Sequence, residues 1–410
     1  MYVPSPIPEH QIYDVFQNDR YIVMVGVGAG LGECGVGGLG GATVSPSIKR
    51  RVYLCLPDSV DETIIFLKEF ETIHCPKGHT TLYRYPQTEY TSIINVKISV
   101  ESATATPAPR FITYHRLLVN HYPAYNDEVI LSTMVKNEDA YIRQWVEYHR
   151  QFGITRFCIY DNSDSPDTRY HSKEKTSDLY KVLKDHVNAG IVIILHWPYP
   201  KFLKDTGVSG QTTQQTHAIH AFNRANYLGL FDIDEYLNPQ YDLTKIGDIL
   251  DDIIGIKGET HDRIGGIYLN CRLFYNISGA DESGDGFLDV ADCTKISLYQ
   301  YRKCFVIPEN VVTYSVHMPS LSKPFINDIP VVSSRILFNH YFFLNKPTRG
   351  RKYTGGQLYV DSSIQRHVRV LRGEGEREDK GSPPTNPIST ITDTTDTTDT
   401  TETTDISPLT

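Results

Sequence analysis

Three carboxylates stand close together at the end of an apolar segment in the middle of the chain. Residues 228–231 have the composition of a buried strand, and Asp232, Asp234 and Glu235 follow at once. Mg²⁺ and Mn²⁺ prefer oxygen ligands, and an ion held by one or two carboxylates keeps positions open for a substrate's phosphates. The Asp-x-Asp spacing therefore indicates a Mn²⁺ or Mg²⁺ site that binds a nucleoside diphosphate, with Asp232 and Asp234 as ligands.

Apolar runs and helical patterns alternate before this motif. We expect four strands, at residues 129–135, 157–160, 191–195 and 228–231. We expect three helices between them, the first capped by Asn137 and stopped by Gly153, the others at residues 176–188 and 211–226. This order predicts an α/β fold with a mostly parallel sheet and helices on both faces.

Polar side chains follow the first two expected strands. Lys136 and Glu138 come after the first strand, and Asp161 and Asn162 end the second. In open α/β sheets ligands bind outside the carboxyl ends of the strands, so we expect these residues in one crevice with the Asp-x-Asp motif. Two alternatives stay open: Glu138 also suits the first turn of a helix, and Asp161 also suits a turn-capping role.

Composition excludes several classes of function. The net charge is −9, and residues 372–410 hold three Lys or Arg against nine Asp or Glu, which gives −6 there and −3 for the rest. A nearly neutral body without a basic stripe argues against nucleic acid as a partner. The seven cysteines form no Cys-x-x-Cys pair, which argues against zinc and thioredoxin chemistry.

The chain shows neither a secretory signal nor a transmembrane segment. Its first residues lack a basic start followed by an apolar stretch, and no apolar run reaches the length of a membrane span. We therefore expect a cytoplasmic protein rather than a Golgi-associated one.

Three regions differ in composition. Residues 1–125 show short β-like runs between Gly, Pro and Ser clusters, with one helical stretch at 61–70, and we expect a small β-rich accessory domain. Residues 126–371 carry the alternating strand and helix pattern, and we expect them to form the α/β domain. Residues 372–410 repeat Thr and Asp with almost no apolar side chains, which predicts a disordered tail.

Four segments in order make the chain similar to a known family. KNEDAYIRQWVEYHRQFGITRFCIYDNSDS, QTHAIHAFNRANYLGLFDIDEYL, RKCFVIPENVVTYSVHMP and FNHYFFLNKPTRGRK resemble glycosyltransferase family 92, one of the family-2-like glycosyltransferases. The resemblance covers roughly residues 128 to 355. It implies a GT-A fold and a metal-dependent, inverting transfer of a sugar, which we expect to be UDP-linked, to a glycan or other hydroxyl acceptor.

The resemblance also implies roles for single residues. Asp234 is expected to be the more direct metal ligand, and Asp161, with Asn162, to bind the nucleobase or ribose. Lys136 and Glu138 are expected beside the donor. Lys303 is expected to meet the diphosphate, although a solvated strand-edge lysine fits the sequence as well.

Histidines and acidic residues complete the expected site. His317 ends an apolar run and is preferred over His340, which lies among aromatic residues, as the third metal ligand. An inverting transfer needs a general base for the acceptor hydroxyl, and Asp281, Glu282 and Asp285 are the candidates, with a solvated acidic loop as the alternative.

Two other functions stay open. A nucleotidyl- or phosphotransferase can use a similar sheet and metal pair, but no basic or Gly-rich triphosphate loop follows the first strand. A non-catalytic sugar-binding relative is the other. Its support is the sequence CRLFY at residues 271–275, where members of the family carry a Trp and later a Phe-Gly pair facing the acceptor.

Overall fold

The computed structural model describes most of the chain, in fourteen stretches. They are residues 12–26, 48–57, 65–74, 80–102, 110–163, 178–199, 202–203, 208–240, 245–274, 295–315, 318–324, 326–329, 335–341 and 359–373. Several predictions lie outside these stretches: His317, the three candidate bases Asp281, Glu282 and Asp285, and the expected tail beyond residue 373.

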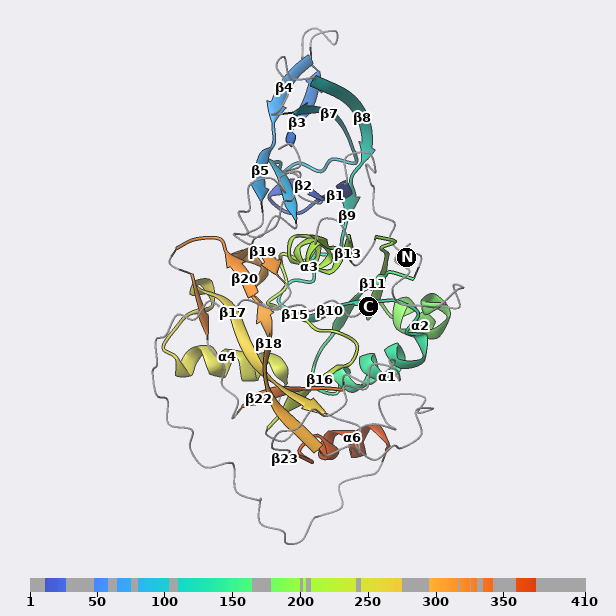
Figure 1. Cartoon of the computed structure of the whole chain (residues 1–410), viewed down its shortest axis with the longest axis vertical. Coiled ribbons are helices and arrows are strands. Elements are labelled where there is room, and N and C mark those ends of the chain that lie inside the picture. Colours follow the sequence, from blue (N-terminus) through green and yellow to red (C-terminus); the bar gives the residue numbers. More distant parts are fainter. Residues whose placement is uncertain are drawn as a thin grey trace, which may run out of the picture.

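A mixed ten-stranded sheet forms the centre of the larger part of the molecule (Figure 1). Its first half contains the four expected strands, which run parallel in the order β12-β11-β10-β15. Their bounds are β10 Val129–Val135, β11 Arg156–Asp161, β12 Val192–His196 and β15 Tyr227–Leu230. Each is a short run rich in apolar side chains that are buried on both faces of the sheet, as expected of parallel strands.

The second half of the sheet mixes strand directions, so the expected mostly parallel arrangement holds only for the first half. The order continues β15-β18-β17-β22-β16, with β18 antiparallel to both its neighbours and β16 antiparallel to β22. The bounds are β16 Glu235–Pro239, β17 Ile264–Phe274, β18 Lys295–Val306, β21 Asn327–Ile329, β22 Ile336–His340 and β23 Tyr359–Val360. β21 pairs with β17, and β23 with β18.

Helices cover both faces of this sheet. Alternate strand residues point to opposite sides: Leu131 and Phe157 pack with α1, α2, α4 and α6, whereas Ile130 and Cys158 pack with α3. The helices are α1 Asp139–Arg150, α2 Leu179–Asn188, α3 Gly210–Ala221, α4 Ile246–Ile256 and α6 Gln365–Leu371. No helix in the described stretches is long and apolar enough to cross a membrane.

The start of α1 corrects one prediction. The residue at the N-cap is Glu138, which makes no side-chain capping bond, and the expected cap Asn137 lies one residue earlier. Asn137 has φ +54°, and its backbone N–H donates to Ser163 Oγ at 3.2 Å. The turn out of β10 requires a left-handed residue, a conformation that Asn tolerates better than most residues.

Two small sheets form the N-terminal part. One has the order β5-β6-β2-β1-β9 and the other β4-β3-β7-β8. Their strands are β1 Ile12–Gln17, β2 Tyr21–Gly26, β3 Ile48–Pro57, β4 Ile65–Glu69, β5 Glu71–His74, β6 Thr81–Pro86, β7 Ile93–Ser102, β8 Arg110–Leu118 and β9 Asn120–His121. The helix expected at 61–70 is wrong over residues 65–69, which form β4 paired with β3.

The five-stranded sheet is buried on both faces. Ile22 and Met24 pack against the four-stranded sheet, whereas Val23 and Val25 belong to the same apolar cluster as Ile219 of α3. Figure 1 accordingly shows α3 between β1 and β2 above and the large sheet below. The N-terminal part therefore shares a core with the catalytic part.

Short elements complete the described chain. β13 Phe202–Leu203 pairs with β14 Val208–Ser209, and β19 Val311–Ser315 pairs with β20 Met318–Leu321. Two single-turn 3₁₀ helices span His261–Arg263 and Pro308–Asn310.

Candidate functional site

The direction in which the chain winds reverses between β10 and β15. The helix after β10 packs on one face of the sheet, and the helix before β15 packs on the other. Such a switch point leaves room for a ligand outside the carboxyl ends of the two strands. The Asp-x-Asp motif follows β15 there. Its turn is closed by two hydrogen bonds, from Glu235 N–H to Asp232 O at 3.1 Å and from Asp232 N–H to Glu235 Oε2 at 2.8 Å.

A buried lysine meets the first carboxylate of the motif. Lys303, on β18, is 2 % exposed, and its Nζ lies 2.9 Å from Asp232 Oδ2 and 3.1 Å from Glu235 Oε2. Burial by itself lowers the pKa of Lys303, but the Asp232 and Glu235 carboxylates outweigh it and raise that pKa above its usual value. The sequence predicted Lys303 in this crevice, and the structure places it in contact with the motif.

Glu235 joins the cations on either side of the motif. One carboxylate oxygen accepts from Lys303, and the other lies 3.9 Å from Nδ1 of His340. Burial raises the pKa of Glu235 to about 7, opposed by Lys303 and reinforced by Asp232. The sequence analysis counted this carboxylate but gave it no role. Its place as the first residue of β16, directly across from His340 in the register, is the signal that was missed.

His340 lies beside the second aspartate. Its Nε2 is 3.5 Å from Asp234 Oδ2, and the next residue, Tyr341, donates its N–H to Asp234 O at 2.9 Å. Burial lowers the pKa of His340, but the Asp234 carboxylate raises it well above the usual value. His340 thus lies beside the motif, and the neighbouring aromatic residue Tyr341 stacks on Phe274.

Helix α3 holds the other oxygen of Asp232. Gln211 donates from Nε2 to Asp232 Oδ1 at 2.6 Å, and Gln214, one turn later, donates to Ser132 Oγ on β10 at 2.9 Å. The Asp232 carboxylate is thus fixed by an amide and an ammonium group.

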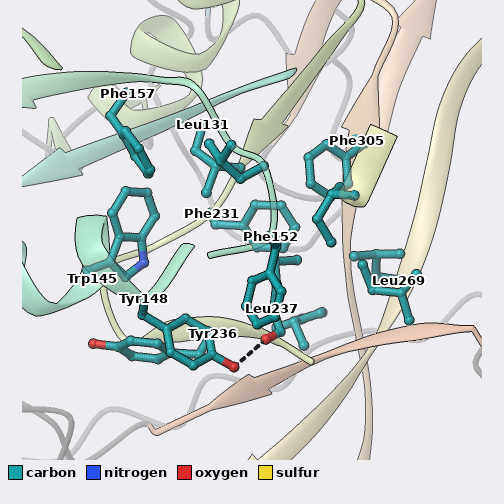
Figure 2. Packing of buried hydrophobic residues seen from close by; sticks show 14 of the residues in the cluster. Leu131, Trp145, Tyr148, Phe152, Phe157, Phe231, Tyr236, Leu237, Leu269 and Phe305 are labelled. Atoms are coloured by element: carbon teal, nitrogen blue, oxygen red, sulfur yellow. Dashed lines mark hydrogen bonds between the residues drawn. The ribbon is translucent and has the colours of Figure 1, made fainter. Parts of the chain in front are cut away.

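The outer edge of β16 is held by side chains of α1. The Trp145 indole N–H donates to Glu235 O at 3.0 Å. The Tyr148 hydroxyl donates to Leu237 O at 2.7 Å, the bond marked in Figure 2. His149 accepts from Leu237 N–H at 3.2 Å through Nε2 and donates through Nδ1 to Trp145 O at 2.8 Å. These bonds require His149 to be neutral, and burial lowers the pKa of this histidine to about 3. From the sequence alone, the face of α1 that carries Trp145 and His149 was expected only to pack in the apolar core.

The residues after β10 and β11 are near neighbours, because Val135 pairs with Asp161. Asp161 Oδ1 accepts from Ser163 N–H at 3.0 Å. Asp161 therefore caps a turn, as in the second of the two roles that its sequence position suggested. Asn162 donates from Nδ2 to Trp197 O at 2.6 Å and Tyr199 O at 2.5 Å. The side chains of both residues therefore shape the loops that border the crevice.

Lys136 and Glu138 border the crevice on its β10 side. The Lys136 N–H donates to Glu138 Oε2 at 3.3 Å. Burial raises the pKa of the Tyr236 hydroxyl well above its usual value, and the charges of Asp234 and Glu138 raise it further. The charges of Glu138 and Asp234 therefore both act on the Tyr236 hydroxyl.

Two groups in the crevice suit a divalent cation. Ligand atoms that share one ion at bond lengths near 2.1 Å lie about 3 Å apart, and the 3.5 Å between Asp234 and His340 is close to that separation. Within the described stretches no group of three His, Cys, Asp or Glu side chains is placed to hold a metal ion. Asp234 and His340 are thus close enough together to bind one ion, provided that its remaining ligands come from a substrate, from water or from other residues. Asp232 already contacts Lys303.

The chain matches a family of known proteins. Residues 129–370, more than half of the chain, match the model of a family described as glycosyltransferase family 92. A family 92 protein of Oryza sativa subsp. japonica is 25% identical over 68% of this chain and 41% of its own length. One of Ricinus communis is 24% identical over 44% and 29%, and one of Arabidopsis thaliana is 29% identical over 27% and 16%.

The chain spans less than half the length of these relatives. Among solved structures, a sialyltransferase from Photobacterium damsela matches 66% of this chain and 42% of its own, at 10% identity and a TM-score of 0.16, which carries no argument about the fold.

Proposed function

We propose, from the premise that this chain belongs to glycosyltransferase family 92, that it transfers a sugar from a nucleoside diphosphate sugar to a hydroxyl group of a glycan or similar acceptor. One observation carries the proposal. The Asp232–Glu235 turn follows β15, the last of the four parallel strands, at the switch point of the sheet, and it has Lys303 on one side and His340 on the other.

A GT-A fold is part of the proposal. It is supported by the parallel order β12-β11-β10-β15, in which the first strand and the motif strand are neighbours. The donor is proposed to be a UDP sugar, with its nucleoside over the ends of β10 and β11. There Asp161, Asn162, Lys136 and Glu138 border the crevice. The diphosphate would then reach the Asp232–Glu235 turn.

Mn²⁺ or Mg²⁺ is proposed to be held by Asp234, with His317 or the deprotonated form of His340 as a further ligand. When bound, the ion would act as a Lewis acid that stabilises the negative charge of the departing nucleoside diphosphate. The chain's own residues have separate tasks. Lys303 and Gln211 fix the Asp232 carboxylate, Glu235 fixes Lys303, and α1 holds the strand that carries Glu235.

The proposed transfer inverts the anomeric centre. The acceptor oxygen bonds to the anomeric carbon on the face opposite the diphosphate, the bond to the diphosphate oxygen breaks, and a carboxylate takes the hydroxyl proton. Asp281, Glu282 and Asp285 are the candidates for this base, on the basis of the acidic sequence in which they stand between residues 274 and 295.

Two measurements test the proposal. Calorimetry with UDP is expected to show binding in Mn²⁺ and little binding in EDTA, and equal affinity in both would exclude the metal bridge. A screen of UDP sugars in Mn²⁺ is expected to detect slow hydrolysis with release of UDP. Release of pyrophosphate from a nucleoside triphosphate would instead identify a nucleotidyltransferase, and sugar binding without turnover would identify a binding protein.

A further inference from the structure

Helix α3 is polar and yet completely buried. All twelve of its residues, Gly210–Ala221, are buried, and most of them carry amide, hydroxyl or imidazole groups. Burying such groups is unfavourable unless each finds a hydrogen-bond partner. Its polar groups have partners on the N-terminal sheet, on the strands that carry the candidate site and on β19. α3 therefore connects the N-terminal sheet physically to the candidate site.

The strongest contact on the N-terminal side is a buried carboxylate. Asp14, on β1, and His217, on α3, are both 0 % exposed, and His217 Nε2 lies 2.9 Å from Asp14 Oδ2. The same carboxylate accepts from Tyr122 OH at 2.5 Å, Asn120 Nδ2 at 2.9 Å and Val15 N–H at 2.8 Å. Four donors thus surround Asp14, and one of them belongs to α3.

The contact continues from His217 to the site. His217 Nδ1 shares a hydrogen bond of 2.7 Å with the hydroxyl of Tyr160, the residue before Asp161. Gln214 and Gln211 precede His217 by three and six residues, so each of the three lies about one turn from the next along α3. The side chains of Gln214 and Gln211 bond to Ser132 on β10 and to Asp232 in the motif. One helix therefore reaches from Asp14 to the Asp-x-Asp turn.

A carboxylate is an unusual choice if only stability were needed at this position. A buried ion pair is often no more stabilising than well-packed apolar residues of the same volume. A carboxylate does, however, fix orientation. Because Asp14 can only accept, Nε2 of His217 must carry a proton, and the ring is further confined by Phe16 at 4.8 Å and Trp197 at 5.0 Å between ring centroids.

We propose that Asp14 is a positioning residue of the transferase site, acting through His217 to hold α3 and thereby Gln211 against Asp232 and Tyr160 beside Asp161. The N-terminal sheet is then part of the catalytic scaffold. The inference rests on the proposed function, because that function makes the Asp-x-Asp turn a transferase site. The contacts from Asp14 to Asp232 are independent of that function.

Asp14→Asn tests the proposal, because the amide keeps the shape and replaces one acceptor oxygen with a donor. We expect faster amide hydrogen exchange than in wild type in residues 210–221 and in residues 232–237. We also expect UDP affinity in Mn²⁺ to fall by about 10-fold, as for other residues that orient a site without touching the ligand. Tyr160→Phe, which removes a single hydroxyl, is expected to give the same pattern with a smaller amplitude, and it replaces Asp14→Asn if that variant does not fold.

Ile98→Ala is the matched control. Ile98 is buried in the core between the two N-terminal sheets and is not in the cluster that contains α3. Its faster exchange is expected to be confined to the N-terminal strands, with unchanged exchange at residues 232–237 and unchanged UDP affinity.

Two results would overturn the proposal. One is an Asp14→Asn variant that leaves residues 232–237 as protected as in wild type. The other is an Ile98→Ala variant with the same exchange pattern as Asp14→Asn. If wild type binds no UDP, the proposed function fails while the exchange data still decide the role of Asp14.

Discussion

Lys303 places its ammonium group 2.9 Å from the carboxylate of Asp232, so the first aspartate of the motif and a buried lysine form one unit. The motif is therefore divided between two tasks. Asp232 and Glu235 surround a fixed positive charge of the protein, and Asp234 faces His340 on the neighbouring strand. The two aspartates are not equivalent, and their variants are expected to behave differently.

Removing the lysine should destabilise the protein. Lys303→Met leaves the Asp232 and Glu235 carboxylates together without their shared cation, and breaking a buried pair in this way costs about 3–5 kcal/mol. Urea unfolding measures the loss. Lys257→Met, at the exposed end of α4, is the control and should change stability by less than about 0.5 kcal/mol. A Lys303→Met protein as stable as the control would show that the buried contacts do not stabilise the fold.

Asp234→Asn should abolish most transfer and leave the fold intact. The change removes a charge at the end of the turn and almost no volume, and the loss of one such transition-state contact typically lowers the rate by about 10²- to 10³-fold. Steady-state turnover and thermal melting are measured on the same sample. Wild-type turnover in the purified variant would remove Asp234 from the site.

The two histidines can be separated by the metal concentration that activity requires. His340→Ala removes the imidazole beside Asp234, so we expect a higher Mn²⁺ concentration for half-maximal activity and a small change in melting temperature. The same titration on His317→Ala tests the preference drawn from the sequence. A shift only in His317→Ala would assign the ligand to His317 and leave His340 as a charge partner of Asp234.

Acid should destabilise the protein through histidines that are buried in the neutral form. Burial lowers the pKa of His149 to about 3 and that of His220 to about 4. Below the ordinary pKa of about 6.5, the unfolded chain binds protons that the folded chain does not, so the free energy of unfolding falls as the pH falls. Each histidine should contribute a loss of about 2 kcal/mol at pH 5.

Urea unfolding between pH 7 and pH 5 measures this dependence. His149→Gln should be less stable than wild type at pH 7, because it disturbs the bonds to Trp145 and Leu237, but its stability should vary less with pH. Equal slopes for the two proteins would show that His149 is not the group that titrates.

Gly229 should not tolerate a side chain. A Cβ at this position in β15 would lie 2.7 Å from Phe305 Cε1 and 2.9 Å from Phe231 Cε2, and it would also meet Leu131. Gly229→Ala is therefore expected to cost about 1–3 kcal/mol through overpacking. Gly255→Ala, on the exposed side of α4 with no atom within 4 Å, should be neutral or stabilising by up to about 1 kcal/mol. Melting temperatures compare the two, and a destabilised Gly255→Ala would refute the packing explanation.

The pattern of apolar and polar residues along the sequence was sufficient to predict the first half of the large sheet. Apolar runs such as Val129–Val135, each followed by a helical period, fixed which strands are parallel and where Asp161 and Asp232 leave the sheet. These features depend on neighbours in the sequence, and the alternation of strand and helix leaves few topologies open.

Contacts between distant segments could not be predicted in this way. The pairing of Glu235 with His340 joins strands about a hundred residues apart, and only that register shows which histidine of the described chain faces the motif. Similarly, the composition of α3 favours a solvated helix, whereas its residues Gln214 and His217 bond to groups on β1, β10 and β11. A polar side chain gives no sign in the sequence of a partner two hundred residues away.

The hydrogen bond from Trp145 to the motif strand has an optical consequence. The chain contains two tryptophans. Trp145 donates to Glu235 O, and Trp197 lies against His217 and Tyr160 in the contact with the N-terminal sheet. The tryptophan fluorescence of the protein therefore originates next to the two regions whose coupling is proposed. Trp145→Phe and Trp197→Phe would each leave one tryptophan, so that the emission of the two variants reports separately on the sheet that supports the motif and on the motif itself.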